Sequence, residues 1–101
     1  MNRVVITGIG IYSCLGENLE EVTKSLYHGT SGIIYDEPRK ELGFRSALIG
    51  FVKKPNLKNV LDRRSRASMA EQVEYAYMAT QEAFKVAQID EDYTEKNEVG
   101  I

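Results

Sequence analysis

The sequence predicts an α/β fold, and three patterns along the chain lead to this prediction. A β-branched, apolar run over residues 3–8 is typical of a strand that is buried on both faces. A capped amphipathic helix is predicted over residues 18–28, and a second, long helical repeat over residues 62–88. A strand followed by helices in this order is typical of a sheet that is flanked by helices.

The predicted first strand and its turn depend on β-branched residues followed by glycines. The run Val4-Val5-Ile6-Thr7 ends at Gly8, and Gly10 follows two residues later. Glycine lets the backbone turn and approach a neighbouring segment closely. We therefore expect a core strand over about residues 3–8 and a tight approach to another element just after it.

The predicted first helix has signals at both ends. Asn18 can cap its N-terminus, and Glu21 stands three residues later in the capping-box position. Gly29 stands where a helix usually ends with a left-handed residue. One apolar face follows at helical spacing: Leu19, Val22 and Leu26. These signals place the helix at about residues 18–28.

Residues 30–60 form an irregular excursion that is longer than a simple connecting loop in a compact domain, which suggests that it has a role of its own. Residues 33–35 and 47–52 are expected to be short extended pieces within it. We expect a turn region over residues 89–98 and the start of a next core strand at residues 99–101.

The long helix predicted over residues 62–88 contains neither glycine nor proline and would measure about 40 Å. Its apolar positions repeat at steps of three and four: Met69, Val73, Tyr77, Thr80, Phe84 and Ala87. Small residues lie near the same stripe: Ala70, Ala76, Ala79 and Ala83. Such a stripe permits close packing and requires a large partner surface.

Composition limits the function classes. The 101 residues allow one domain at most, and a net charge of −2 argues against a general nucleic-acid binder. The single cysteine excludes an internal disulfide and a multi-cysteine metal site. No apolar stretch resembles a signal peptide or a membrane span. We therefore expect a cytoplasmic protein that binds neither membrane nor nucleic acid.

Motifs for catalysis and nucleotide binding are weak. Gly8, Gly10 and Gly16 resemble a dinucleotide fingerprint only in part, because Ser13 stands where the third glycine should be. Cys14 and His28 flank a helix and would be roughly 15 Å apart, too far for a nucleophile and its base. A small buried residue is the better interpretation of Cys14. No cluster has metal-ligand spacing, and no cofactor is predicted.

The charge pattern that stands out is Arg63, Arg64 and Arg66 at the start of the long predicted helix. Cations at a helix N-terminus oppose its dipole, so helix stability alone does not explain them. They indicate either a docking site for an anionic partner or a solvated surface cluster, and the pattern favours neither. Arg45 and the pair Lys53-Lys54 could extend the cluster.

A family resemblance rests on several motifs at matching spacing. Residues 4–16 read VVITGIGIYSCLG, residues 20–22 read EEV, and residues 26–33 read LYHGTSGI. Together they resemble the N-terminus of β-ketoacyl-acyl-carrier-protein synthases, in which V-V-I-T-G-x-G-x-x-S-x-x-G precedes a helix and L-x-x-G-x-S-G-I. Residues 43–46 (GFRS), 50–52 (GFV) and 62–64 (DRR) resemble the type I bacterial branch.

The resemblance implies the N-terminal part of a thiolase-like fold, a mixed sheet flanked by helices, incomplete in this chain. It implies a nucleophilic cysteine and two histidines beyond Ile101, so that Cys14 is not the nucleophile. It implies no metal and no organic cofactor, a homodimer for the full-length protein, and acyl- and malonyl-loaded acyl carrier protein as partner. Basic residues at the start of the long helix would dock that partner: Arg63 and Arg64, with Arg66 and Arg45 as weaker members.

Two positions depart from the family pattern. Cys14 stands where the family usually has proline or serine, and Gln88 where it usually has a helix-ending glycine. We therefore expect the end of the long helix to be less sharply defined.

These observations favour an N-terminal segment of a 3-oxoacyl-carrier-protein synthase, which catalyses a decarboxylative Claisen condensation. The segment would end at the first residues of the second core strand, would be inactive by itself, and would expose apolar surface and self-associate. The alternatives are a non-catalytic carrier-binding paralogue, a chain-length-factor-like partner, and a nucleotide-binding β-α unit.

Overall fold

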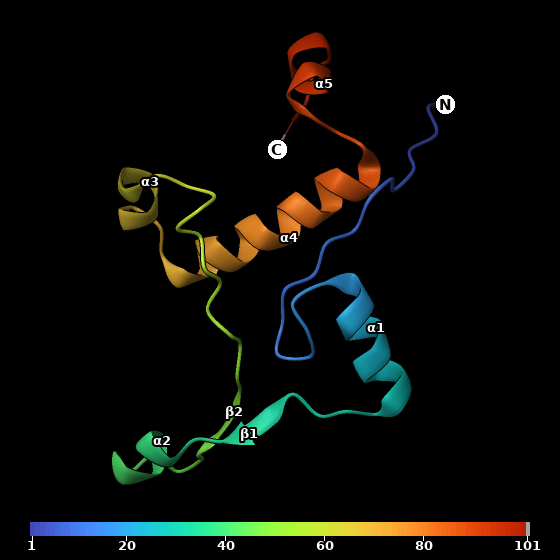
Figure 1. Cartoon of the computed structure of the whole chain (residues 1–101). Coiled ribbons are helices and arrows are strands. Elements are labelled where there is room, and N and C mark those ends of the chain that lie inside the picture. Colours follow the sequence, from blue (N-terminus) through green and yellow to red (C-terminus); the bar gives the residue numbers. More distant parts are fainter. Residues whose placement is uncertain (101) are drawn as a thin grey trace.

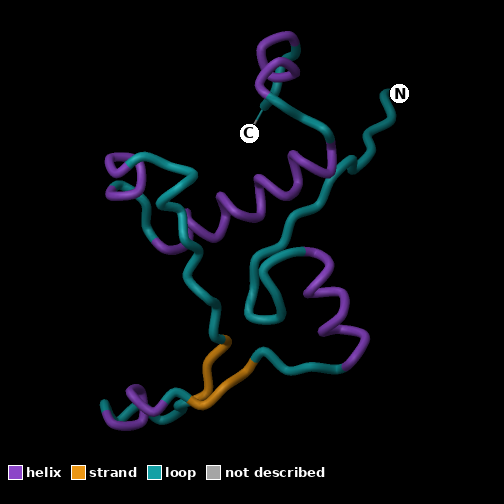
Figure 2. Tube along the Cα trace, in the orientation of Figure 1, coloured by secondary structure: helices purple, strands orange, loops and turns teal. Residues whose placement is uncertain are grey.

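The computed structural model describes residues 1–100, which form an open arrangement of helices, loops and one small sheet (Figure 1). The elements in chain order are α1 (Leu19–His28), β1 (Ile33–Tyr35), α2 (Glu37–Glu41), β2 (Leu48–Gly50), α3 (Arg63–Ala67), α4 (Glu71–Ala87) and α5 (Glu91–Lys96). Loops connect these elements over much of the chain, as Figure 2 shows.

Helix α1 confirms the first predicted helix and both of its caps. Asn18 accepts a hydrogen bond from the backbone N–H of Glu21 at 2.9 Å. The Glu21 carboxylate in turn accepts from the backbone N–H of Glu17 at 2.8 Å, one residue before the usual capping-box partner. Gly29 ends the helix in the left-handed conformation, with φ 64°. The apolar face of α1 buries Val22.

The two short extended pieces pair with each other. Strands β1 and β2 are antiparallel, with Ile33 opposite Gly50 and Tyr35 opposite Leu48. The unpredicted helix α2 lies in the connection between them. Pro38 is in its first turn, where the missing N–H and the fixed φ of proline cost nothing.

The prediction of one helix over residues 62–88 is wrong, because residues 68–70 separate α3 from α4. Ser68 donates its hydroxyl to the Ser65 carbonyl at 2.8 Å, a local bond that competes with the helical ladder. Ala70 is extended, with ψ 161°, and α4 begins after it.

The end of α4 is sharply defined, contrary to the expectation from the missing glycine. Gln88 itself adopts the left-handed conformation, with φ 57°. Its N–H bonds to the Lys85 carbonyl at 3.2 Å, and that of Ile89 bonds to the Phe84 carbonyl at 2.9 Å. These two bonds form a Schellman cap, which outweighs a left-handed cost of roughly 1–2 kcal/mol for an L-residue.

The expected turn region over residues 89–98 contains a helix, α5, that the sequence analysis missed. Asp90 caps it by accepting from the Tyr93 N–H at 2.8 Å. Lys96 and Asp92 pair across one turn at 2.7 Å. Val99 and Gly100 are not in a strand, and Ile101 lies outside the described residues.

The core strand predicted over residues 3–8 is not present as a strand. The segment is irregular and pairs with no other part of residues 1–100; Val4 is 93% and Ile6 83% exposed. A strand requires a hydrogen-bonded neighbour, and β1 and β2 pair only with each other. The buried apolar residues of the described chain are few: Val22, Ala47 and Leu57.

The N-terminal segment instead lies along α4 (Figure 1). A Cβ on Gly8 would overlap the Ala83 carbonyl, and one on Gly10 would overlap the Ala79 carbonyl. The expected close approach is therefore confirmed, and the alanine stripe of α4 has a partner surface within this chain. This packing fixes α4, whose first turns border the candidate site.

Candidate docking site

Helix α3 carries the predicted arginines, and Asp62 caps its N-terminus. Asp62 accepts from the Ser65 N–H at 2.7 Å, and this hydrogen bonding lowers the pKa of the carboxyl below its usual value. A carboxylate at the cap offsets the unfavourable placement of cations in the first turn. Arg63 and Arg64 are exposed, whereas Arg66 is half-buried and donates from Nε to the Leu61 carbonyl at 3.3 Å.

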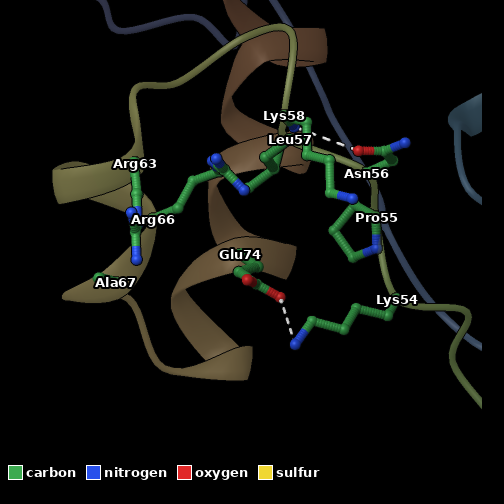
Figure 3. A pocket seen from close by; sticks show the side chains of 9 residues that line it. All are labelled: Lys54, Pro55, Asn56, Leu57, Lys58, Arg63, Arg66, Ala67 and Glu74. Carbon is green, nitrogen blue, oxygen red and sulfur yellow. Dashed lines mark hydrogen bonds and ion pairs between the residues drawn. The ribbon is translucent and has the colours of Figure 1, made fainter.

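A basic cavity of about 340 Å³ lies between residues 54–58, α3 and the start of α4 (Figure 3). Four cationic side chains line it: Lys54, Lys58, Arg63 and Arg66. The segment that carries the lysines is anchored by Leu57, which is only 3% exposed. Asn56 also accepts from the Lys58 N–H at 3.2 Å, which fixes the turn between them.

Glu74 is the single carboxylate in the lining of this cavity. The residue is 8% exposed, and its Oε2 atom is buried with no hydrogen-bond partner among the described residues. The nearest charge is Lys54, whose Nζ lies 3.7 Å from Oε2, as the dashed line in Figure 3 shows. Since Lys54 is itself largely exposed, this ion pair compensates the buried carboxylate only in part.

The structure brings together some of the predicted residues and separates others. Arg63, Arg64 and Arg66 share α3, but only Arg63 and Arg66 line the cavity. None of these three pairs with a carboxylate within residues 1–100. Arg45 lies in the loop between α2 and β2, and α2 lies well away from α3 in Figure 1, so Arg45 does not belong to the cluster.

The lysines that could extend the cluster divide in the same way. Lys53 pairs with Glu17 at 3.4 Å, whereas Lys54 lines the cavity. Sequence reasoning missed Lys58 and Glu74. The available signals were a third lysine close to Lys53-Lys54 and a carboxylate one helical turn after Ala70, on the apolar stripe.

The remaining chemical candidates have structural contacts. Cys14 packs so closely on Gly32 that a Cβ there would overlap it. The Nδ1 atom of His28 lies 2.7 Å from the Lys24 carbonyl of its own helix. Across residues 1–100, no group of three or more His, Cys, Asp or Glu residues could hold a metal ion.

Two further findings concern the nucleotide-binding alternative and the expectation that no segment spans a membrane. Gly8 and Gly10 face the backbone of α4 so closely that neither position has room for a side chain, and these two glycines of the partial fingerprint therefore serve helix packing. No helix in the described part of the chain is long and apolar enough to cross a membrane.

Comparison with known proteins identifies the family. The family model for the beta-ketoacyl synthase N-terminal domain matches residues 1–101. The chain is 45% identical over 97 residues to 3-oxoacyl-[acyl-carrier-protein] synthase 1 of Buchnera aphidicola from Acyrthosiphon pisum, covering 96% of this chain and 24% of that protein. It is 38% and 36% identical to the proteins of the same name from Haemophilus influenzae and Escherichia coli K12, covering 100% of this chain and 25% of each.

The chain thus spans about a quarter of the length of these curated relatives. The match extends over the opening motif, the excursion and both segments of the predicted long helix. It confirms the resemblance that the glycine spacing and the S-G-I turn indicated. The chain belongs to the beta-ketoacyl synthase family, and its sequence corresponds to the N-terminal domain of that family.

Proposed function

We propose that this chain forms the N-terminal part of a 3-oxoacyl-acyl-carrier-protein synthase with a thiolase-like fold. The observation that carries this proposal is the match of the family model to the whole chain, together with relatives that bear this name. In the proposed reaction an acyl group on an enzyme cysteine is attacked by the carbanion that malonyl-carrier protein forms on losing CO₂. A carbon–carbon bond forms, the thioester to the cysteine breaks, and 3-oxoacyl-carrier protein is released.

Residues 1–101 supply no catalytic group in this proposal. The nucleophilic cysteine and two histidines would lie beyond Ile101, in a cytoplasmic homodimer that needs no metal or organic cofactor. The packing of Cys14 against Gly32 and the bond of His28 to its own helix support this assignment. Both side chains serve the local structure, and a nucleophile needs a base within hydrogen-bond reach.

The contribution of this segment to function would be docking of the acidic carrier protein by α3. Arg63 and Arg64 are exposed, and Arg66 projects into the neighbouring cavity. Cations without a carboxylate partner of their own can form charge-assisted hydrogen bonds to an acidic partner. Arg45 is left out of this docking surface because it lies on the hairpin that β1 and β2 form.

A chimera tests the proposed activity. The corresponding N-terminal quarter of the E. coli synthase 1 is replaced by this chain, and the release of 3-oxoacyl-carrier protein is measured. We expect condensation by the chimera and none by the 101-residue chain alone. A folded chimera that binds carrier protein without condensing would contradict the proposal that this chain serves as the N-terminal part of a condensing synthase. Condensation by the chain alone would contradict the absence of catalytic residues.

Charge reversal tests the docking surface. The double variant Arg63→Glu/Arg64→Glu should raise the Kd for acyl carrier protein at least about tenfold, measured by fluorescence anisotropy at low salt. Lys40→Glu is the matched control, because Lys40 is an exposed cation on α2, far from α3 in Figure 1. Equal affinities of the control and the double variant would exclude α3 as the docking element.

A further inference from the structure

We propose that the basic cavity beside α3 receives one carboxylate side chain of the acidic partner, and that Lys58 is a docking residue alongside Arg63 and Arg66. The inference rests on the proposed function and adds a second segment to its docking surface. The docking surface then includes a cavity that is lined by two segments, residues 54–58 and α3 (Figure 3).

The shape and charge of the cavity carry the first step. Its volume of about 340 Å³ is suited to a side chain, and Lys58, Arg63 and Arg66 line it from two directions. None of these three takes part in an ion pair within residues 1–100. Arg66 is additionally oriented by its bond to the Leu61 carbonyl, which leaves its terminal nitrogens available as donors.

The rigidity of the lysine segment carries the second step. Leu57 is buried, and the Asn56 side chain closes a turn onto the Lys58 N–H. The backbone that carries Lys58 is therefore fixed beside the cavity before any partner arrives. A fixed arrangement of cations loses less entropy on binding than the same charges on a free loop.

Glu74 lies in the lining of the same cavity and has the same negative charge as the partner's carboxylate. Its ion pair occupies Lys54, so the other three cations remain for the partner. A buried carboxylate there repels a second carboxylate and lowers the affinity of the cavity for it. The two kinds of substitution should therefore change the affinity in opposite directions. Removing the Glu74 charge should strengthen binding, whereas removing a cation should weaken it.

The experiment measures the Kd for E. coli apo-acyl carrier protein, which has no prosthetic phosphate, with this chain and again with the chimera. Lys58→Glu should weaken binding about tenfold, Lys58→Gln less, and Glu74→Gln should tighten it about two- to fivefold. Lys40→Glu should stay within about twofold of the unaltered protein. Circular dichroism checks that each variant keeps its helix content.

The outcomes separate the inference from the proposed function. If Arg63→Glu/Arg64→Glu weakens binding while Lys58→Glu and Glu74→Gln do not change it, the cavity inference is wrong and docking by α3 stands. If none of the variants changes the Kd, both are wrong. If Lys58→Glu weakens the affinity only for the holo-carrier protein, which bears the prosthetic phosphate, the cavity binds a phosphate. The inference that it receives a carboxylate is then wrong.

Discussion

Tyr12 joins three distant segments through one side chain. Its ring stacks on Tyr75 of α4, with centroids 5.7 Å apart and an interplanar angle of 11°. Its hydroxyl donates to the Lys53 carbonyl at 2.7 Å. Burial is the largest cause that raises the pKa of Tyr12, and the nearby carboxylate of Glu17 adds to it.

The raised pKa of Tyr12 predicts a loss of stability at alkaline pH. A tyrosine with a raised pKa stabilises the fold fully below its ordinary pKa of about 10, and this contribution is lost as the pH rises through the raised value. Deprotonation also removes the donor to Lys53. Tyr12→Phe should cost about 0.5–1.5 kcal/mol at neutral pH and should flatten the decline above about pH 10.

Urea unfolding followed by circular dichroism at a series of pH values measures this effect. Tyr27→Phe is the control, because Tyr27 is exposed. Parallel declines of the unaltered chain and Tyr12→Phe above pH 10 would show that Tyr12 does not cause the alkaline loss.

At the residue scale, the predictable features were those set by near neighbours in sequence. The caps Asn18 and Gly29 act within three or four residues, so the sequence alone locates them. Lys58 and Glu74 line one cavity only because segments 16 residues apart in the sequence fold together. Charge count indicates a cluster but cannot show which of its members face one another.

At the element scale, α4 is the helix that holds the N-terminal segment and the start of α1. The Glu82 carboxylate accepts from the Ile11 N–H at 2.9 Å and from the Leu19 N–H at 2.8 Å, so it ties both the N-terminal segment and the start of α1 to α4. Gly8 and Gly10 contact the same helix closely enough to exclude any side chain. The glycine pattern therefore serves helix packing in this fold.

Gly10→Ala should disrupt this packing. The added methyl group would overlap the Ala79 carbonyl, and relieving the overlap would separate the segment from α4. Overpacking of this kind costs about 1–3 kcal/mol, to be measured as a lower urea midpoint. The amide of Ile11 should also exchange faster with deuterium, because its bond to Glu82 would lengthen.

Gly100→Ala is the matched control, since a Cβ there meets no atom within 4 Å. Equal urea midpoints for Gly10→Ala and Gly100→Ala would mean that the contact between Gly10 and α4 does not stabilise the chain.

The predicted elements differ in outcome for one physical reason. Helix α1 obtains its hydrogen bonds and caps locally, so local patterns are sufficient to predict it. The same patterns indicate the two extended pieces that form β1 and β2, but they do not show that the two strands pair. The strand over residues 3–8 requires a neighbour that residues 1–100 do not supply. The helix over residues 62–88 failed at Ser68, where a side-chain bond competes with the backbone, a detail that apolar periodicity does not record.

At the scale of the whole molecule, the chain is far from compact. Its accessible surface is 8799 Å², whereas a compact protein of 11.4 kDa exposes about 5,800 Å². The radius of gyration is 17.4 Å, against about 13 Å for a compact domain of this length. The described residues therefore leave much of their apolar surface in water.

This open shape predicts that the chain self-associates in dilute buffer. Val4, Val5 and Ile6 form a continuous exposed apolar run with no strand partner within the described residues, which makes it a template for pairing with another copy. Val5→Lys should lower the mean mass of the particles at a given concentration, because a charge on an unpaired edge opposes pairing. Size-exclusion chromatography with light scattering over a dilution series measures that mass.

Thr30→Lys is the matched control for Val5→Lys. It adds the same charge at an exposed polar position, and it should leave the mass unchanged. A monomer at every concentration, or equal masses for both lysine variants, would show that residues 4–6 do not drive association.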